Sequence, residues 1–117
     1  MRALSQKSEY HTVYDRGRTW AGHPLVIKAL PNTRAYSRFG FSVGKTVGKA
    51  VVRNKVRRRL KEIVRLAPVA PGWDIVIIAR ADCANSDYAR LRRAFEKTLI
   101  RAKLIAENDE TSSTGIN

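Results

Sequence analysis

The residues with the clearest chemical role in this sequence are Arg53 and Asn54. An arginine guanidinium binds phosphate oxygens in pairs, and an asparagine amide offers both a donor and an acceptor to a sugar or base. Both residues lie in a strongly cationic stretch, residues 44–66, where nine of 23 residues are Lys or Arg and Glu62 is the only acid. This composition indicates a surface that binds a phosphate-rich partner.

A helix that starts near Ala50 must position these side chains. Its apolar residues recur at three- and four-residue spacing and fill an arc of about 120°, while the remaining arc is almost wholly cationic. A solvated helix face is the ordinary interpretation of a charge run. Charges of one sign repel each other along a helix, however, and this favours an external anion. The helix N-terminus adds backbone N–H groups and a dipole that also favour anions. The apolar arc consists of Val52, Val56, Leu60, Ile63 and Val64.

The order of residues in this stretch resembles the protein subunit of bacterial ribonuclease P. That family has a basic loop, a turn similar to VGNAV, and an RN pair followed by further Lys and Arg on the same helix. Residues 45–58 read KTVGKAVVRNKVRR, with Lys49 where Asn is common and Lys55 where a second Arg often completes RNR. Both departures keep or add positive charge. The resemblance implies that the catalytic RNA subunit is bound by Lys45, Lys49, Arg53, Asn54, Lys55, Arg57 and Arg58.

A second candidate site lies in a predicted helix near the N-terminus. Ser8 as N-cap and Glu9 in the first turn indicate where the helix starts, and Gly17 is a natural stop. Tyr10 and Tyr14 share one face of this helix with an intervening valine. Core packing is the ordinary interpretation of such a face.

Tyrosine nevertheless keeps a polar tip and a flat face on which unpaired bases stack. The resemblance implies that Tyr10 and Tyr14 border a cleft that holds the 5′ leader of precursor tRNA. Lys28, the polar residue of a nearby apolar strand, would meet a leader phosphate if the strand floors this cleft. We expect the leader surface and the RNA-subunit surface to be separate.

Composition limits the remaining possibilities. The chain has 117 residues, 44% of them hydrophobic, and a net charge of +13, which is typical of a single domain that meets nucleic acid or an anionic membrane surface. No apolar run approaches the roughly 20 residues that cross a bilayer, and no signal peptide is recognisable. Cys83 is the single cysteine, so an internal disulfide is excluded and a cytoplasmic location is expected. His11 and His23 lack metal-ligand spacing, which argues against a zinc site.

The order of predicted elements gives an α+β fold. We expect a two-layer sandwich in residues 1–106, a single RNA-binding domain, followed by a disordered polar tail at 107–117. Residues 1–7 are expected to be a mobile arm, and residues 31–37 a loop that joins antiparallel neighbours. A last helix is expected to begin with Asn85 or Ser86 as N-cap. The predicted strands are a short edge strand at 18–23, an apolar strand at 25–30, an alternating strand at 38–43 and a central strand at 73–80.

The resemblance adds topology to this outline. It implies a four-stranded sheet of the ribosomal protein S5 domain 2-like type, with a left-handed β-α-β crossover from strand 38–43 through the basic helix to strand 73–80. Generic rules favour the right-handed form, which accounts for about 98% of such connections. We follow the family in this expectation.

The leading functional hypothesis is the protein subunit of ribonuclease P, which assists a catalytic RNA in removing the 5′ leader from precursor tRNA. The resemblance implies that Mg²⁺ is held mainly by the RNA and that the protein carries no catalytic residue. The sequence agrees in lacking clustered carboxylates and nucleophile–base pairs. A non-catalytic ribosomal or ribosome-assembly protein is the alternative, and a free-standing nuclease would need acids and metal ligands that are not recognisable. No membrane partner and no small-molecule substrate are expected.

Overall fold

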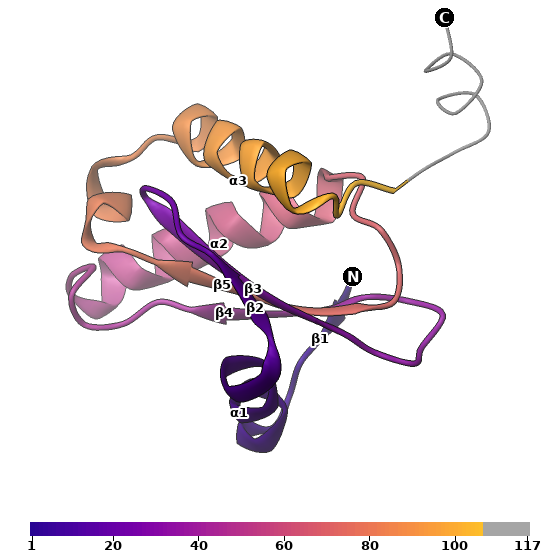
Figure 1. Cartoon of the computed structure of the whole chain (residues 1–117). Coiled ribbons are helices and arrows are strands. Elements are labelled where there is room, and N and C mark those ends of the chain that lie inside the picture. The colour runs from indigo at the N-terminus through magenta and orange to yellow at the C-terminus, as the bar shows by residue number, and fades with distance from the viewer. Residues whose placement is uncertain (107–117) are drawn as a thin grey trace, which may run out of the picture.

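The computed structural model describes residues 1–106, so the predicted polar tail at 107–117 lies outside the described residues. The predicted elements are present, and two short ones, β1 and η1, are added to them (Figure 1). In chain order the elements are β1 (Arg2–Ala3), α1 (Lys7–Arg16), β2 (Arg18–Trp20), β3 (Leu25–Pro31), β4 (Arg38–Ser42), α2 (Ala50–Leu66), β5 (Trp73–Ala79), the 3-10 helix η1 (Ala81–Asn85) and α3 (Tyr88–Ala102).

The sheet has the strand order β1-β4-β5-β3-β2. Strand β5 is central, parallel to β4 and antiparallel to β3. Its residues Ile75, Val76 and Ile77 are fully buried, which confirms the prediction from its continuous apolar run. The expectation that residues 31–37 join neighbouring strands is wrong, because β5 lies between β3 and β4. A strand that is apolar on both faces is stable only where it is covered on both, and this position provides that cover.

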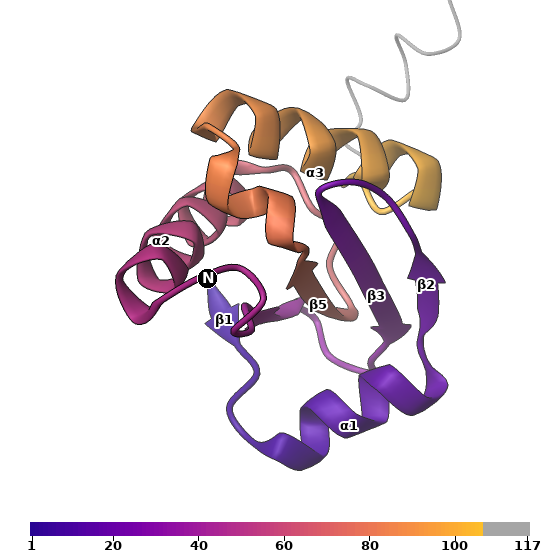
Figure 2. The same ribbon diagram turned by 90° about the vertical axis from the view of Figure 1, so that its left-hand side faces the viewer.

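Helices cover the two faces of the sheet unequally. Helices α2 and α3 pack together on one face, and α1 crosses the opposite face (Figure 2). Eighteen buried hydrophobic residues form the main core between the sheet and α2 and α3. Among residues 1–106, the buried cluster at α1 consists of Leu4, Val13 and Val76. The predicted two-layer packing is therefore present, and α1 adds partial cover to the outer face.

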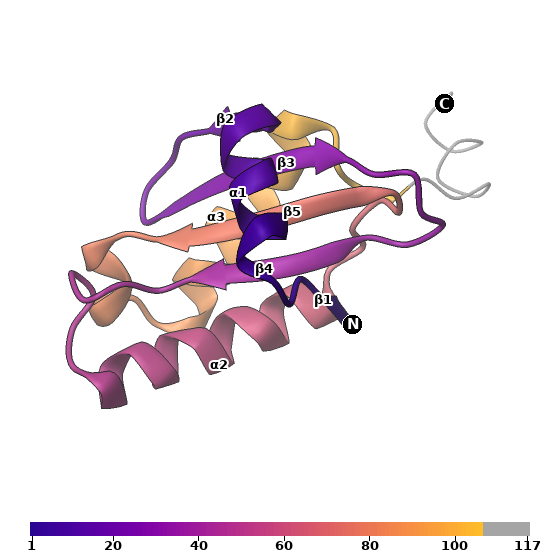
Figure 3. The same ribbon diagram turned by 90° about the horizontal axis from the view of Figure 1, so that it is seen from below.

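The connection from β4 through α2 to β5 is left-handed, as expected. In Figure 3, α1 lies in front of the sheet and α2 behind it, while β4 and β5 both run to the left. The chain leaves β4, passes behind the sheet as α2 and returns in β5, which lies above β4 in this view. Val56, Leu60 and Ile63 of α2 are buried against the sheet, so the predicted apolar arc faces the core.

The first residues differ from the sequence-based expectation of a mobile arm. Arg2 and Ala3 form a fifth strand parallel to the start of β4, and Leu4 is buried. The first helix begins after Gln6 rather than Ser8, because the Glu9 carboxylate accepts hydrogen bonds from the backbone N–H groups of Ser5 (2.8 Å) and Gln6 (2.9 Å). These bonds satisfy helix-end donors that would otherwise be unpaired.

The start of the last helix also differs from the prediction. Asp87 is the N-cap of α3 and accepts a hydrogen bond from the Arg90 backbone N–H at 2.8 Å. Asn85, one of the two expected caps, instead ends the 3-10 helix η1. Ser86, the other, is buried and donates its hydroxyl to the Asp82 carbonyl. A carboxylate is stabilised at a helix N-terminus because the free backbone N–H groups and the helix dipole favour negative charge there.

Candidate nucleic-acid interface

The loop between β4 and α2 is held in a fixed shape by its small and apolar residues. Val47 is 4% exposed and joins the main core. Gly48 adopts a φ of +148°, and a Cβ at this position would lie 3.1 Å from the Val52 Cβ. Glycine meets both demands at no steric cost. The neighbouring Lys45 and Lys49 are exposed, so the loop directs their ammonium groups to solvent.

The first turns of α2 carry the remaining predicted phosphate ligands. Arg57 donates to the Asn54 side-chain oxygen at 2.9 Å, so the asparagine orients this guanidinium. Arg53 is half-buried, and its Nε has no hydrogen-bond partner among the described residues. Lys55 and Arg58 are exposed. An unpaired buried donor is costly, and a phosphate oxygen would satisfy it.

Within the described part of the chain, this cationic surface has no acid placed to neutralise it. No acidic residue lies in the first turn of α2. Among residues 1–106, none of its members forms an ion pair. By contrast Arg59, on the same helix, donates to the Ser86 carbonyl at 3.0 Å and helps to fix α2 against the start of α3. The seven residues predicted to bind the RNA subunit therefore lie on one loop and one helix end.

Tyr10 lies over the backbone of β4 in a space that only glycine leaves open. A Cβ at Gly40 would lie 2.5 Å from Cε2 of the Tyr10 ring. The Phe41 backbone N–H donates to the Tyr10 hydroxyl at 3.3 Å. Gly40 lies inside the alternating strand predicted at 38–43, and its missing side chain makes room for this tyrosine.

Tyr14 and Lys28 extend the same surface. Tyr14 is 36% exposed, and the Lys28 ammonium lies 5.8 Å from the centroid of its ring and 3.5 Å from its carbonyl oxygen. A cation over an aromatic face is attracted by the ring quadrupole. Tyr10 and Tyr14 also line one open hollow of about 380 Å³ beside α1. The structure thus brings all three predicted leader-binding residues onto one surface.

Arg38 fixes α1, and with it Tyr10, to the sheet. Its guanidinium donates to the Glu9 carboxylate of α1 at 2.6 Å and to both Asp74 oxygens of β5 at 2.9 and 2.6 Å. Asn32 donates to Asp74 at 2.8 Å. Sequence patterns do not predict this network, because its members come from distant segments of the chain.

The network shifts the ionisation of both carboxylates. Hydrogen bonds from the Gln6 and Ser5 backbone, aided by the Arg38 charge, lower the pKa of Glu9 to about 2. Burial opposes the ionisation of Asp74, but hydrogen bonds from Arg38 and Asn32 outweigh it and lower the pKa of this group too. Both side chains are therefore charged at neutral pH, and each holds its hydrogen bonds most strongly in that form.

The two predicted surfaces meet at the open edge of β4. A hollow of about 250 Å³ is lined by Tyr10 from α1 and by Arg57 and Lys61 from α2, with Phe39 and Phe41 between them. The expectation of separate surfaces is therefore wrong at this point. The cause is the short β1, which pairs with β4 only at Arg38 and Phe39 and leaves the rest of that edge uncovered.

The described residues carry no metal cluster and no membrane span. Within residues 1–106, no three His, Cys, Asp or Glu side chains come close enough to hold a metal ion. No helix among those residues is long and apolar enough to cross a membrane. Cys83 is buried, and burial raises the pKa of its thiol to about 11, so it is not a nucleophile at neutral pH.

The chain is similar in sequence to proteins of one known family. Residues 1–103 match the family described as Ribonuclease P. Relatives named Ribonuclease P protein component include one from Dehalococcoides mccartyi strain CBDB1, 41% identical over 94% of this chain and 92% of that protein. Another, from Roseiflexus castenholzii, is 43% identical over 87% of this chain and 86% of its own length.

Solved structures show the same architecture. The RNase P protein of Staphylococcus aureus superposes with a TM-score of 0.81 and 26% identity, covering 90% of this chain and 98% of its own. The RNase P protein of Thermotoga maritima gives a TM-score of 0.78 and 27% identity, covering 86% of this chain and 97% of its own.

Proposed function

The chain belongs to the ribonuclease P protein family, and on this premise we propose that it binds both the catalytic RNA subunit and the 5′ leader of precursor tRNA. As a member of the family it is a protein component of an RNA–protein enzyme. The observation that carries the proposal is the cationic end of α2, which has no acid to neutralise it among residues 1–106 and lies next to a tyrosine-lined surface. The alternative of a ribosomal or ribosome-assembly protein is not favoured, because the family match spans nearly all of the described residues.

The RNA subunit is held through its phosphate backbone. Lys45, Lys49 and the first turns of α2 offer point charges and guanidinium forks, and Arg53 Nε has no partner within residues 1–106. Each phosphate contact releases counterions, so binding weakens with salt at somewhat under one unit of log–log slope per contact. These phosphate contacts therefore determine how tightly the protein binds the RNA subunit, and they contribute little to any preference for a base sequence. They come from Arg53, Asn54, Arg57 and the neighbouring cations.

The leader is held as a single strand. Tyr10 and Tyr14 offer aromatic faces, and Lys28 supplies a cation beside them. Stacking of an unpaired base on an aromatic side chain contributes about 1–3 kcal/mol with little sequence preference. This suits a substrate class whose leaders differ in sequence.

Chemistry at the scissile phosphate is assigned to the RNA partner. Residues 1–106 hold no group of three or more His, Cys, Asp or Glu side chains that could bind a metal ion, and we place the catalytic Mg²⁺ with the RNA. RNA-free protein is expected not to cleave precursor tRNA, and metal-dependent cleavage that survives repurification would contradict this assignment. The buried, unpaired Cys83 suits the reducing cytoplasm, where we place the assembly.

Two double variants test the division of labour. Arg53→Ala with Arg58→Ala avoids Arg57, which also lines the hollow beside Tyr10, and should weaken assembly with the RNA subunit and flatten its salt dependence. Tyr10→Ala with Tyr14→Ala should leave assembly normal but reduce the preference for leader-bearing precursor over mature tRNA.

The measurements are affinity for the RNA subunit and for both tRNA forms across a salt series. Arg93→Ala with Lys97→Ala removes the same charge from the exposed face of α3 and serves as the control for the arginine pair. If the arginine pair behaves like this control, the cationic end of α2 is not the RNA-subunit surface. If the tyrosine and arginine variants lose the same function in the same proportion, the division is wrong.

A further inference from the structure

Three hollows follow one another from α1 around the open edge of β4. The first lies beside α1 and the second at the β4 edge, and Tyr10 lines both. The third lies between β1, the loop before β4 and the end of α2, and it shares Met1 and Phe39 with the second. The hollow that contains Tyr10 and Phe39 is therefore adjacent to the third one.

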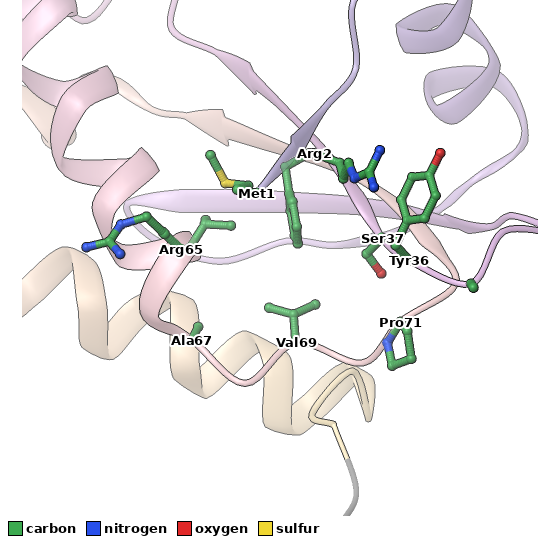
Figure 4. Close-up of a pocket in the computed structure, with 11 residues that line it drawn as sticks. Met1, Arg2, Tyr36, Ser37, Arg65, Ala67, Val69 and Pro71 are labelled. Atoms are coloured by element: carbon green, nitrogen blue, oxygen red, sulfur yellow. The ribbon is translucent and has the colours of Figure 1, made fainter.

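The third hollow, which we name the Tyr36 pocket, has a volume of about 310 Å³. Val69 and Pro71 form part of an apolar wall, and the Arg2 guanidinium lies beside the Tyr36 ring (Figure 4). The guanidinium carbon of Arg2 is 4.4 Å from the centroid of that ring. An apolar wall next to an aromatic ring and a guanidinium plane is a suitable environment for an unpaired base.

Two arginines beside the Tyr36 ring, Arg2 in the pocket wall and Arg34 next to it, carry positive charge. The guanidinium carbon of Arg34 lies 5.9 Å from the same ring centroid, and Arg34 Nη1 donates to the Tyr36 hydroxyl at 3.2 Å. Neither Arg2 nor Arg34 forms an ion pair within residues 1–106. Arg65 lines the pocket too, but it is paired with Glu62 and its guanidinium points away from Tyr36 (Figure 4).

Two cations held near one ring repel each other unless an anion lies between or beside them. The phosphate of a nucleotide supplies that anion, and its base supplies the apolar, planar group that the wall accepts. Among single-stranded RNAs the leader fits best, because the hollow that contains Tyr10 shares Met1 and Phe39 with this pocket.

We propose that the Tyr36 pocket binds an unpaired nucleotide of the leader, further from the cleavage site than the nucleotides at Tyr10 and Tyr14. The base stacks against Tyr36 and the Arg2 guanidinium, and Arg34 contacts its phosphate. The inference rests on the proposed leader-binding function and extends it to a longer track. Longer leaders are therefore expected to gain affinity that short leaders do not have.

The test uses holoenzyme reconstituted with the RNA subunit and precursor tRNAs with leaders of increasing length. Arg34→Gln with Tyr36→Leu should leave affinity for short leaders unchanged and lose about 5- to 150-fold for leaders long enough to reach the pocket, the value of one stacked base. Tyr36→Phe keeps the ring and should retain most of the affinity. Arg93→Gln on the exposed face of α3 is the matched charge control.

Crosslinking supplies a measurement that does not depend on a variant. With 4-thiouridine placed at successive leader positions, residues 34–37 should crosslink only to positions beyond those that crosslink to α1. The proposal is overturned if the double variant matches the control at every leader length, or if it loses affinity equally for mature tRNA. A wild-type holoenzyme whose affinity does not depend on the leader would instead overturn the leader-binding function itself.

Discussion

Replacing Arg38 by methionine tests whether one guanidinium fixes α1 to the sheet. Arg38 makes one hydrogen bond to Glu9 and two to Asp74. Methionine keeps an unbranched apolar stem but removes every donor and the charge. We expect the variant to unfold at lower urea concentration and to bind leader-bearing precursor less tightly, because Tyr10 lies on the helix that is released.

The magnitude follows from the burial of the three side chains. Those of Arg38, Glu9 and Asp74 are 15%, 23% and 10% exposed, so the network is only slightly solvated. Removing one partner of a fully buried pair costs about 3–5 kcal/mol, since a charge is left unpaired. Here Asp74 keeps its bond from Asn32, and Glu9 keeps its backbone donors. We therefore expect a loss of about 2–4 kcal/mol.

The chain supplies its own control in Arg65→Met. Arg65 and Glu62 form a similar paired contact, with N–O distances of 3.2 and 2.7 Å, but their side chains are 56% and 46% exposed. Exposed ion pairs contribute much less to stability than buried ones, because water and salt screen them. Urea unfolding followed by circular dichroism gives the free energy of unfolding of both variants. If Arg38→Met costs no more than Arg65→Met, burial of the network does not determine its strength.

Acid provides a second measurement on the same network. The pKa of Glu9 in the folded protein is about 2, whereas an unperturbed glutamate has a pKa of about 4.3. A lowered pKa means that the stabilisation is complete above the unfolded value and is lost as pH falls toward the folded one. The pKa of Asp74 is lowered as well. The difference between wild type and Arg38→Met should therefore be largest near neutral pH and shrink below about pH 4.

Three further substitutions test separate parts of the fold. Gly40→Ala places a Cβ 2.5 Å from the Tyr10 ring and should cost about 1–3 kcal/mol by overpacking while weakening leader binding; Gly44→Ala, with nothing within 4 Å, should change neither urea unfolding nor leader affinity. Lys103 has a φ of +58° and a ψ of +42° at the end of α3, so Lys103→Gly should stabilise the protein by about 1 kcal/mol in the same assay, and a loss would argue against this cap. Phe95 is fully buried, and Phe95→Ala should cost about 3–5 kcal/mol in urea unfolding; a loss below about 1 kcal/mol would mean that the core can close around the cavity.

The elements that the sequence predicts correctly are those with strong local patterns. The apolar arc of α2 and the continuous apolar run of β5 depend only on residues close in the chain, and both lie where expected. Strand β1 has no such pattern, since a two-residue strand exists only because Arg2 and Ala3 pair with β4 and Leu4 is buried beneath α1. The position of β5 between β3 and β4 also depends on contacts between segments that are distant in the chain.

The same distinction applies to the site. Helix periodicity predicts that Tyr10 and Tyr14 share one face, and the structure places Lys28, the third predicted leader residue, beside the Tyr14 ring. The contact between Arg2 and Tyr36 joins segments that are distant in the chain, and no spacing rule connects them. The seat of Tyr10 on β4 was missed for the same reason, although a glycine inside an alternating strand is a known sign of close approach.

The unequal cover of the sheet has a consequence for motion. Helix α1 is held by the three-residue cluster of Leu4, Val13 and Val76 and by the Arg38 network, whereas eighteen buried residues secure α2 and α3. Segments with few buried contacts open locally at a lower free energy than the whole domain unfolds. Amide hydrogens of α1 should therefore exchange with solvent through opening of that helix alone, whereas those of β5 should exchange only when the whole domain unfolds. A leader bound across Tyr10 must hold α1 closed, so slowed exchange in α1 would report occupancy of the leader surface directly.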